Sequence, residues 1–290
     1  THTANFGEIN PSNNDKMPAS LHEIAFHDTP ADAECLRDPR FRQLAARAFY
    51  QGIVKFFHSY YYLSLGNADF SDNTLLPEPP THFRATLNGT GGIHLAWDAP
   101  PYNTGDNLLG DAATGYRVYR STHPKGFADG VAVAGTSYTD TSGLVDGTVY
   151  YYRVSATNSG GESFPTETLA VRHQSGGMNP ILIVSGFNRL DRFAMIVTDD
   201  PHSANDLHRE YLDRMNSYDY VTFAAEDIEA YGEFFDSCSN EAVEAGDIAL
   251  GAYQAVVWLL GEESVSDETF SAAEQSAVQT YLNGGGKLFV

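Results

Sequence analysis

The chain has 290 residues, 42% of them hydrophobic and 12% aromatic, which is enough for two or three domains with packed cores. Its 38 acidic residues outnumber 17 basic ones and give a formal net charge of −21. A field of that sign repels phosphate backbones and anionic lipid, so nucleic acid and membrane surfaces are excluded as favoured partners. No run of about 18 apolar residues occurs, and the sequence therefore predicts no membrane span.

The ends of the chain and its two cysteines bear on its origin. The chain lacks an initiator Met and stops inside an apparent buried strand, KLFV, so we expect a fragment of a longer protein. The missing signal peptide then says nothing about export. Cys35 and Cys238 form no CxxC pair, and they fit a cytosolic protein and a secreted one equally.

Residues 1–65 combine a strand signal with one strong helix signal. The stretch DPRFRQLAARAFYQGIVKFF predicts a helix over 38–57, with Asp38 as N-cap and Pro39 at the first helical position. Its apolar residues recur at i, i+3, i+4 and i+7, so this face must pack on something, which we expect to be a sheet. A shorter helical turn is predicted to begin at Thr29-Pro30.

The preceding apolar stretch, ASLHEIAF at 19–26, predicts a strand that carries Glu23. Side chains alternate along a strand, so Glu23 and His22 point to opposite faces and cannot both serve one site without a sharp twist. A buried, unpaired carboxylate is costly, which places Glu23 at a sheet edge, in a cleft or beside a cation. From composition alone, a structural or surface glutamate is the favoured interpretation.

The rest of the chain divides by texture into a β-rich part and an α/β part. Residues 66–80 are rich in Asn, Asp, Ser and Pro and predict a linker. Residues 81–172 contain short strands between turn residues, as in a single all-β sandwich. After a second linker at 173–177, residues 178–290 alternate strands and helices, which predicts an open parallel sheet covered by helices. The strands are predicted at 179–187, 220–228, 253–261 and 287–290, and the helices at 205–216 and 271–286.

The order of motifs from Ala4 to Phe57 resembles the last third of the zinc-dependent N-acetylmuramoyl-L-alanine amidases. These α/β enzymes cut the bond between N-acetylmuramic acid and L-alanine in peptidoglycan. One departure is His27-Asp28-Thr29, where the family has Ser-Asn. The matching motifs are Ala4-Asn5-Phe6, Met17-Pro18-Ala19, Leu21-His22-Glu23, Ala25-Phe26 and Asp38-Pro39-Arg40-Phe41-Arg42.

This resemblance implies that Glu23 is the catalytic carboxylate, which acts on a zinc-bound water as it attacks the amide carbonyl. The family's zinc ligands, two histidines and a glutamate, would lie upstream of residue 1. We therefore assign no metal ligand in this chain and interpret His2, His22 and His27 as surface or turn residues. The chain alone is expected to bind catalytic zinc weakly or not at all.

Residues 80–172 resemble a fibronectin type III module. Trp97 matches the early core tryptophan, Tyr116 matches the next strand, and LVDGTVYYYRVSATNSGG at 144–161 matches the later strand pattern. The resemblance implies that Tyr150 forms a tyrosine corner, with its hydroxyl bonded to the preceding loop. The Gly- and Asp-rich loop at 98–114 is interpreted as a solvated insertion, with glycan contact as the alternative.

Residues 178–290 look like the start of a glutamine-amidotransferase-like, flavodoxin-like domain, on PILIVSGF, YQAVVWLLGEES and AEQSAVQTYLNGGGKLFV. The turn that would carry a nucleophile in that superfamily lies beyond Val290. Acidic groups at 198–200 and 262–263 lie near predicted strand ends, where α/β sites form, but caps and solvated loops explain them more simply. No GxGxxG fingerprint supports nucleotide binding.

Two functions are consistent with these patterns. The first is a piece of a secreted bacterial peptidoglycan hydrolase, in the extracellular space or cell envelope, with Glu23 as catalytic residue and peptidoglycan or another cell-wall polysaccharide as partner. The second is a non-catalytic surface or polysaccharide-binding protein with a degenerate amidase part. The sequence upstream of Thr1 would distinguish them.

Overall fold

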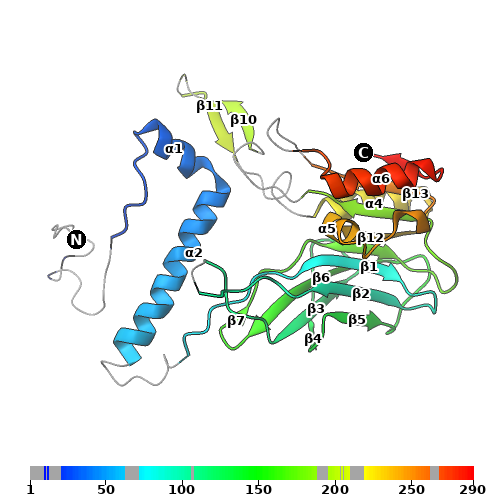
Figure 1. Cartoon of the computed structure of the whole chain (residues 1–290), viewed down its shortest axis with the longest axis horizontal. Helices are drawn as coiled ribbons and strands as arrows, with labels where there is room; N and C mark the ends of the chain where they lie inside the picture. The colour runs from blue at the N-terminus through cyan, green and yellow to red at the C-terminus, as the bar shows by residue number, and fades with distance from the viewer. Residues whose placement is uncertain are drawn as a thin grey trace.

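A helical arm stands beside a β-rich body, and further helices lie along the upper side of that body (Figure 1). The body holds both the predicted sandwich and the predicted parallel strands. Among the described residues, no helix combines the length and the apolar character needed to cross a membrane. The computed structural model describes residues 10, 12, 21–62, 72–105, 108–187, 195–202, 204, 206–209, 219–261 and 268–290.

The arm contains the two helices that the sequence predicts. Helix α1 spans Pro30–Arg37, and helix α2 spans Pro39–Phe56 and continues into a π-helical turn, η1 (Phe57–Tyr62). The Asp38 side chain caps α2 by accepting a hydrogen bond of 2.9 Å from the Arg40 backbone N–H.

The predicted strand at 19–26 is wrong for its described part. Residues 21–26 form no strand, and 19 and 20 lie outside the described residues. A strand needs a hydrogen-bonded neighbour, and within the described part of the chain no segment pairs with this one.

The predicted sandwich is present, built from two antiparallel sheets. One sheet contains β1, β2 and β5, while in the other β4 and β6 flank β3, and β7 and β8 both pair with β6. The strands are β1 (Thr81–Leu87), β2 (Ile93–Asp98), β3 (Gly115–Ser121), β4 (Val131–Val133), β5 (Ser137–Asp140), β6 (Val149–Asn158), β7 (Gly161–Glu162) and β8 (Leu169–Arg172).

Large aromatic side chains fill the space between the two sheets. Trp97 is 1% exposed and packs edge-on against Tyr116, with ring centroids 5.4 Å apart. Tyr152 and Phe83 are fully buried in the same core. The prediction of a core tryptophan at position 97 is therefore confirmed.

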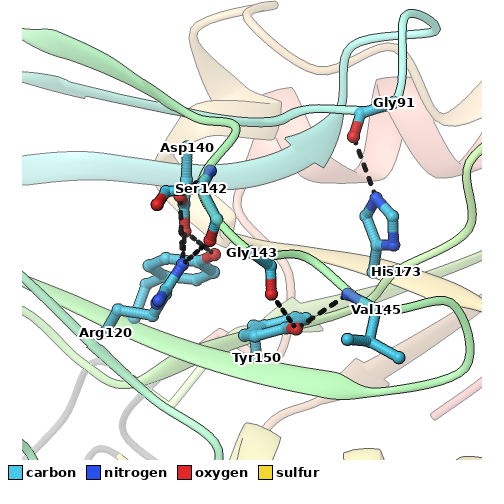
Figure 2. Close-up of polar contacts among 9 residues, drawn as sticks. Gly91, Arg120, Asp140, Ser142, Gly143, Val145, Tyr150 and His173 are labelled. Atoms are coloured by element: carbon cyan, nitrogen blue, oxygen red, sulfur yellow. Dashed lines mark hydrogen bonds and ion pairs between the residues drawn. The ribbon is translucent and has the colours of Figure 1, made fainter.

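The tyrosine corner is also present (Figure 2). The Tyr150 hydroxyl donates to the Gly143 carbonyl at 3.3 Å and accepts from the Val145 N–H at 2.9 Å. These two bonds tie strand β6 to the loop that precedes it, as the sequence predicted.

Replacing Tyr150 by phenylalanine should lower the free energy of unfolding by about 1–2 kcal/mol, because a half-buried N–H and a carbonyl lose their partner while the ring stays in place. Urea denaturation of both proteins measures the difference. Tyr102→Phe, at an exposed tyrosine of the 98–114 loop, is the matched control and should change nothing. Equal stability of wild type and Tyr150→Phe would contradict the prediction.

The α/β part contains the predicted parallel sheet. Strands β14, β13, β9 and β12 lie side by side in that order, and each adjacent pair is parallel. A small antiparallel hairpin, β10–β11, follows β9 in the chain. The elements are β9 (Ile181–Ser185), β10 (Ile196–Asp199), β11 (Asp206–Arg209), α4 (Tyr220–Tyr231), β12 (Phe235–Ser239), α5 (Asn240–Glu244), η4 (Leu250–Ala252), β13 (Ala255–Leu259), α6 (Ala272–Asn283) and β14 (Lys287–Phe289).

Two predicted elements of this part are wrong. Residues 220–228, predicted as a strand, belong to helix α4, which buries Val221 and Ala225 and ends at Gly232 with a φ of 97°. Residues 206–209, predicted as helix, form strand β11, and the rest of that predicted helix lies outside the described residues.

The two parts of the body share one sheet. Its seven strands run β14-β13-β9-β12-β1-β2-β5, and β1 of the sandwich pairs antiparallel with β12 of the α/β part. Residues 173–177 form neither helix nor strand, as predicted for a linker. They connect two parts of one continuous sheet rather than two separate bodies.

Candidate functional site

Glu23 lies on the irregular segment 21–26, beside the helices of the arm. Its side chain is exposed at the wall of an open hollow of about 390 Å³. Among the described residues, the Glu23 carboxylate has no hydrogen-bond or ion-pair partner. An exposed carboxylate in a hollow can exchange protons with water and with a bound molecule. The hollow is lined by His22, Glu23, Ile24, Ala25, Phe26, His27 and Leu36.

Contacts with the two helices hold this segment in place. The Phe26 N–H donates to the Asp32 carboxylate on α1 at 2.9 Å, and the Thr29 N–H donates to the Phe26 carbonyl at 3.1 Å. The His22 ring packs edge-on against Phe49 of α2, with centroids 4.7 Å apart. Glu23 therefore lies between two fixed points although it belongs to no strand.

The residues around Glu23 do not fit a zinc ion. His22 contacts Phe49, and His27 lines the hollow, but no three metal-ligating side chains cluster anywhere among the described residues. His2 lies outside the described residues. We therefore derive no step through a metal for this chain.

The segment 21–26 and helix α2 both expose apolar side chains. In the described part of the chain no side chain buries them, although the sequence predicts that the apolar face of α2 packs on a sheet. The large ones are 40–61% exposed: Leu21, Ile24, Phe26, Leu44, Ile53 and Phe56.

Another side of α2 is attached to the sandwich. Gln51, which is 5% exposed, donates its side-chain amide to the Leu109 carbonyl at 3.1 Å, and Arg47 donates to the Leu108 carbonyl at 3.0 Å. Arg47 also pairs with Glu78, and burial lowers the pKa of Arg47. The 98–114 loop, interpreted as a solvated insertion, is thus in part the docking surface for the arm.

Residues 72–80, the described end of the predicted 66–80 linker, also contact helix α2 and the 98–114 loop. Residues 72–80 form no helix or strand, yet Leu75 is only 4% exposed and its N–H donates to Asp111 at 2.8 Å. The Leu76 N–H donates to the Tyr50 hydroxyl of α2 at 3.1 Å. The sequence did not predict that α2 would attach to the sandwich. Arg47 and Gln51 occupy the polar face of an amphipathic helix, where side chains are usually exposed to solvent.

Within the described ranges, the acidic groups near the predicted strand ends of the α/β part belong to no metal-binding cluster. Asp199 is exposed on the β10–β11 hairpin, and Asp200 accepts a bond of 2.9 Å from the His202 N–H, which is a turn contact. Glu262 and Glu263 lie outside the described residues. Burial raises the pKa of the Cys238 thiol well above its ordinary value, which makes Cys238 a poor nucleophile.

Glu167 lies in an environment that strongly disfavours a negative charge. The Glu167 Oε1 atom is buried with no hydrogen-bond partner among the described residues. Burial, together with the nearby charges of Glu241 and Asp219, raises the pKa of Glu167 to about 8. Glu167 should therefore be mostly protonated at neutral pH in the folded protein.

This shift predicts a pH-dependent loss of stability. The folded protein holds the Glu167 proton up to about pH 8, whereas an unfolded glutamate releases it near its ordinary pKa of 4.5. Rising pH therefore favours the unfolded state across that window. Relative to Glu167→Gln, the wild type should lose about 2 kcal/mol or more between pH 5 and pH 9, as measured by urea denaturation. A difference that stays constant with pH would contradict the prediction.

Comparison with known proteins identifies the sandwich. The family model for the fibronectin type III domain matches residues 78–172. Among solved structures, a fibronectin-type-III-like protein from Clostridium thermocellum is 32% identical over 32% of this chain and 90% of that chain, with a TM-score of 0.27. The twitchin kinase region from C. elegans (24% identity, 34% and 17% covered, TM-score 0.29) and titin domains A168–A170 (26%, 32% and 30%, TM-score 0.27) also match. No curated protein matches the chain.

Proposed function

We propose that this chain is part of a secreted, multidomain hydrolase of peptidoglycan, in which the fibronectin type III domain of residues 78–172 acts as a spacer. The substrate is the amide bond between N-acetylmuramic acid and L-alanine. The site of action is then the extracellular space or the cell envelope. The acidic surface, with a net charge of −21, suits a soluble enzyme that works on a polymer other than nucleic acid.

The observation that carries the proposal is the placement of Glu23. The motif order from Ala4 to Phe41 resembles that of zinc-dependent amidases, and Glu23 stands where that order has the catalytic glutamate. Its carboxylate is exposed over an open hollow and has no competing partner among the described residues. Such a group can accept a proton from an attacking water and return it to the leaving amine.

The zinc that amidases of this type use is proposed to be held by side chains upstream of residue 1. The described residues contain no group of His, Cys, Asp and Glu side chains that could hold a zinc ion. The part of Glu23 in the reaction is limited here to moving a proton at its carboxylate oxygen.

The α/β part is proposed to be a flavodoxin-like unit of the glutamine-amidotransferase type. The parallel strands lie in the spatial order β12-β9-β13-β14, which for four strands in chain order reads 2-1-3-4, as in flavodoxin-like sheets. We assign it no chemistry, because Cys238 is a buried thiol whose pKa is raised.

The proposal is tested by incubating the full-length protein with purified peptidoglycan. Amidase activity should release stem peptides with a new N-terminal L-alanine, which amino-group labelling and mass spectrometry detect. Release of other fragments, such as disaccharides, would contradict the assignment. Sedimentation with peptidoglycan but no release of peptide would instead support the non-catalytic, polysaccharide-binding alternative.

A further inference from the structure

The fibronectin type III domain and the α/β part meet along strand β12. On one side β12 pairs with β9 of its own part, and on the other it pairs with β1, with Ala85 opposite Ser237 and Arg84 opposite Cys238. An edge strand with open N–H and C=O groups is normally a liability that a domain must protect. Here β12 covers that edge of the domain.

A fully buried carboxylate stabilises the pairing of β12 with β1, which we call the seam. Asp236 of β12 accepts hydrogen bonds from the Leu87 N–H of β1 at 3.1 Å, the Asn179 amide at 2.7 Å and the Tyr253 hydroxyl at 3.0 Å. Leu87 belongs to the domain, whereas Asn179 and Tyr253 precede β9 and β13 of the α/β part. One side chain therefore joins groups from both parts, and removing it would leave buried donors unpaired.

Strand β12 is bonded to the second sheet of the sandwich as well. The Ser237 hydroxyl donates to the Ala170 carbonyl of β8 at 2.7 Å and accepts from the Ala170 N–H at 2.8 Å. At the rim, Arg84 pairs with Asp247 at 3.0 Å, and Arg172 donates to the Glu233 carbonyl at 2.9 Å. The seam thus involves both sheets of the domain.

The hydrophobic core is shared in the same way. Phe235 of β12, Ile183 of β9 and Val221 of α4 are fully buried in one continuous cluster with Trp97 and Tyr152 of the sandwich. Neither part closes this cluster without the other. Separating them would expose apolar surface and the seam's polar groups together.

We propose that the fibronectin type III domain and the described strands and helices of the α/β part fold and unfold as a single cooperative unit, in which strand β1 of the domain completes the α/β sheet. The domain then does not move independently on a flexible linker, because its orientation relative to the α/β part is fixed. This inference does not depend on the proposed hydrolase activity.

The two tryptophans of the chain provide a test, because Trp97 lies in the sandwich and Trp258 in the α/β part. In a Trp258→Phe background, only Trp97 reports unfolding by fluorescence, and in a Trp97→Phe background only Trp258 does. Adding Asp236→Ala should lower the urea midpoint by about 1 M in both backgrounds. A shift seen by Trp258 alone would overturn the proposal. Asp227→Ala, at an exposed position of α4, is the matched control and should move neither midpoint.

A second measurement does not rely on a seam variant that folds. A protease recognition sequence is inserted between the exposed Gly176 and Gly177, and the folded protein is cut there. The two pieces should co-elute in size-exclusion chromatography at micromolar concentration and unfold in one transition. Pieces that elute separately, or that unfold in two transitions, would overturn the proposal.

Discussion

Replacing Glu23 by glutamine in the full-length protein is expected to lower the release of stem peptide from peptidoglycan by on the order of 10²–10⁴-fold. Glutamine keeps the size of the side chain and its place over the hollow, but it cannot take up a proton at neutral pH. Zinc content should stay the same, because Glu23 is assigned to proton transfer and not to metal binding. Initial rates with purified peptidoglycan and metal analysis of both proteins measure the two effects.

The matched control is Glu34→Gln on α1, the same chemical change at a nearby exposed glutamate. Glu34 forms a surface ion pair of 2.9 Å with Arg37, and such pairs contribute little to stability, so both activity and zinc content should be unchanged. Retained activity in Glu23→Gln would show that another carboxylate moves the proton. Loss of zinc in that variant would make Glu23 a metal ligand instead.

The elements that the sequence predicted well carry their signals locally. Helix α6 begins with a capping box, in which the Ser271 and Glu274 side chains each bond the other residue's backbone N–H, and it ends at glycines. Helix α2 has Asp38 as its N-cap and Pro39 as its first residue. The buried strands β9 and β13 are short apolar runs of the kind found in parallel sheets.

Strand β12, which the sequence missed, depends on distant partners, whereas helix α4, predicted as a strand, carries local signals. Strand β12, with the sequence FDSCS, gives no hydrophobic signal, yet all five residues are buried because Asp236 and Ser237 find their partners across the seam. Helix α4 begins with β-prone residues, which favoured a strand, although Val221, Ala225 and Ile228 follow helical spacing and Gly232 marks a helix end. Helical spacing and the terminal glycine were the signals that could have identified α4.

The candidate site shows the same division. The motif order singled out Glu23, and the structure places it over an open hollow, but its catalytic role stays a prediction. The attachment of the arm through Arg47 and Gln51 could not be predicted, since both bond to backbone carbonyls more than 50 residues away. Sequence spacing carries no information about such contacts.

Replacing Asp140 by alanine should lower the free energy of unfolding by about 3 kcal/mol. Asp140 is 2% exposed and accepts bonds from Arg120 at 2.9 and 3.1 Å (Figure 2). It also accepts a bond of 2.7 Å from the Tyr152 hydroxyl. Burial and the nearby Asp140 charge both raise the pKa of Tyr152, so its hydroxyl stays a donor. Alanine would leave this buried hydroxyl unpaired. Arg120, which is 40% exposed, can turn to water and limits the loss.

A double-mutant cycle separates the buried bond from the partly exposed ion pair. Tyr152→Phe alone removes the buried hydroxyl, and in that background Asp140→Ala should cost less than it does in the wild type, because no unpaired donor remains. Asp129→Ala, at an exposed position of the same domain, should leave stability unchanged. Equal costs of Asp140→Ala in both backgrounds would place the stabilisation in the ion pair with Arg120 and contradict the assignment to the buried bond.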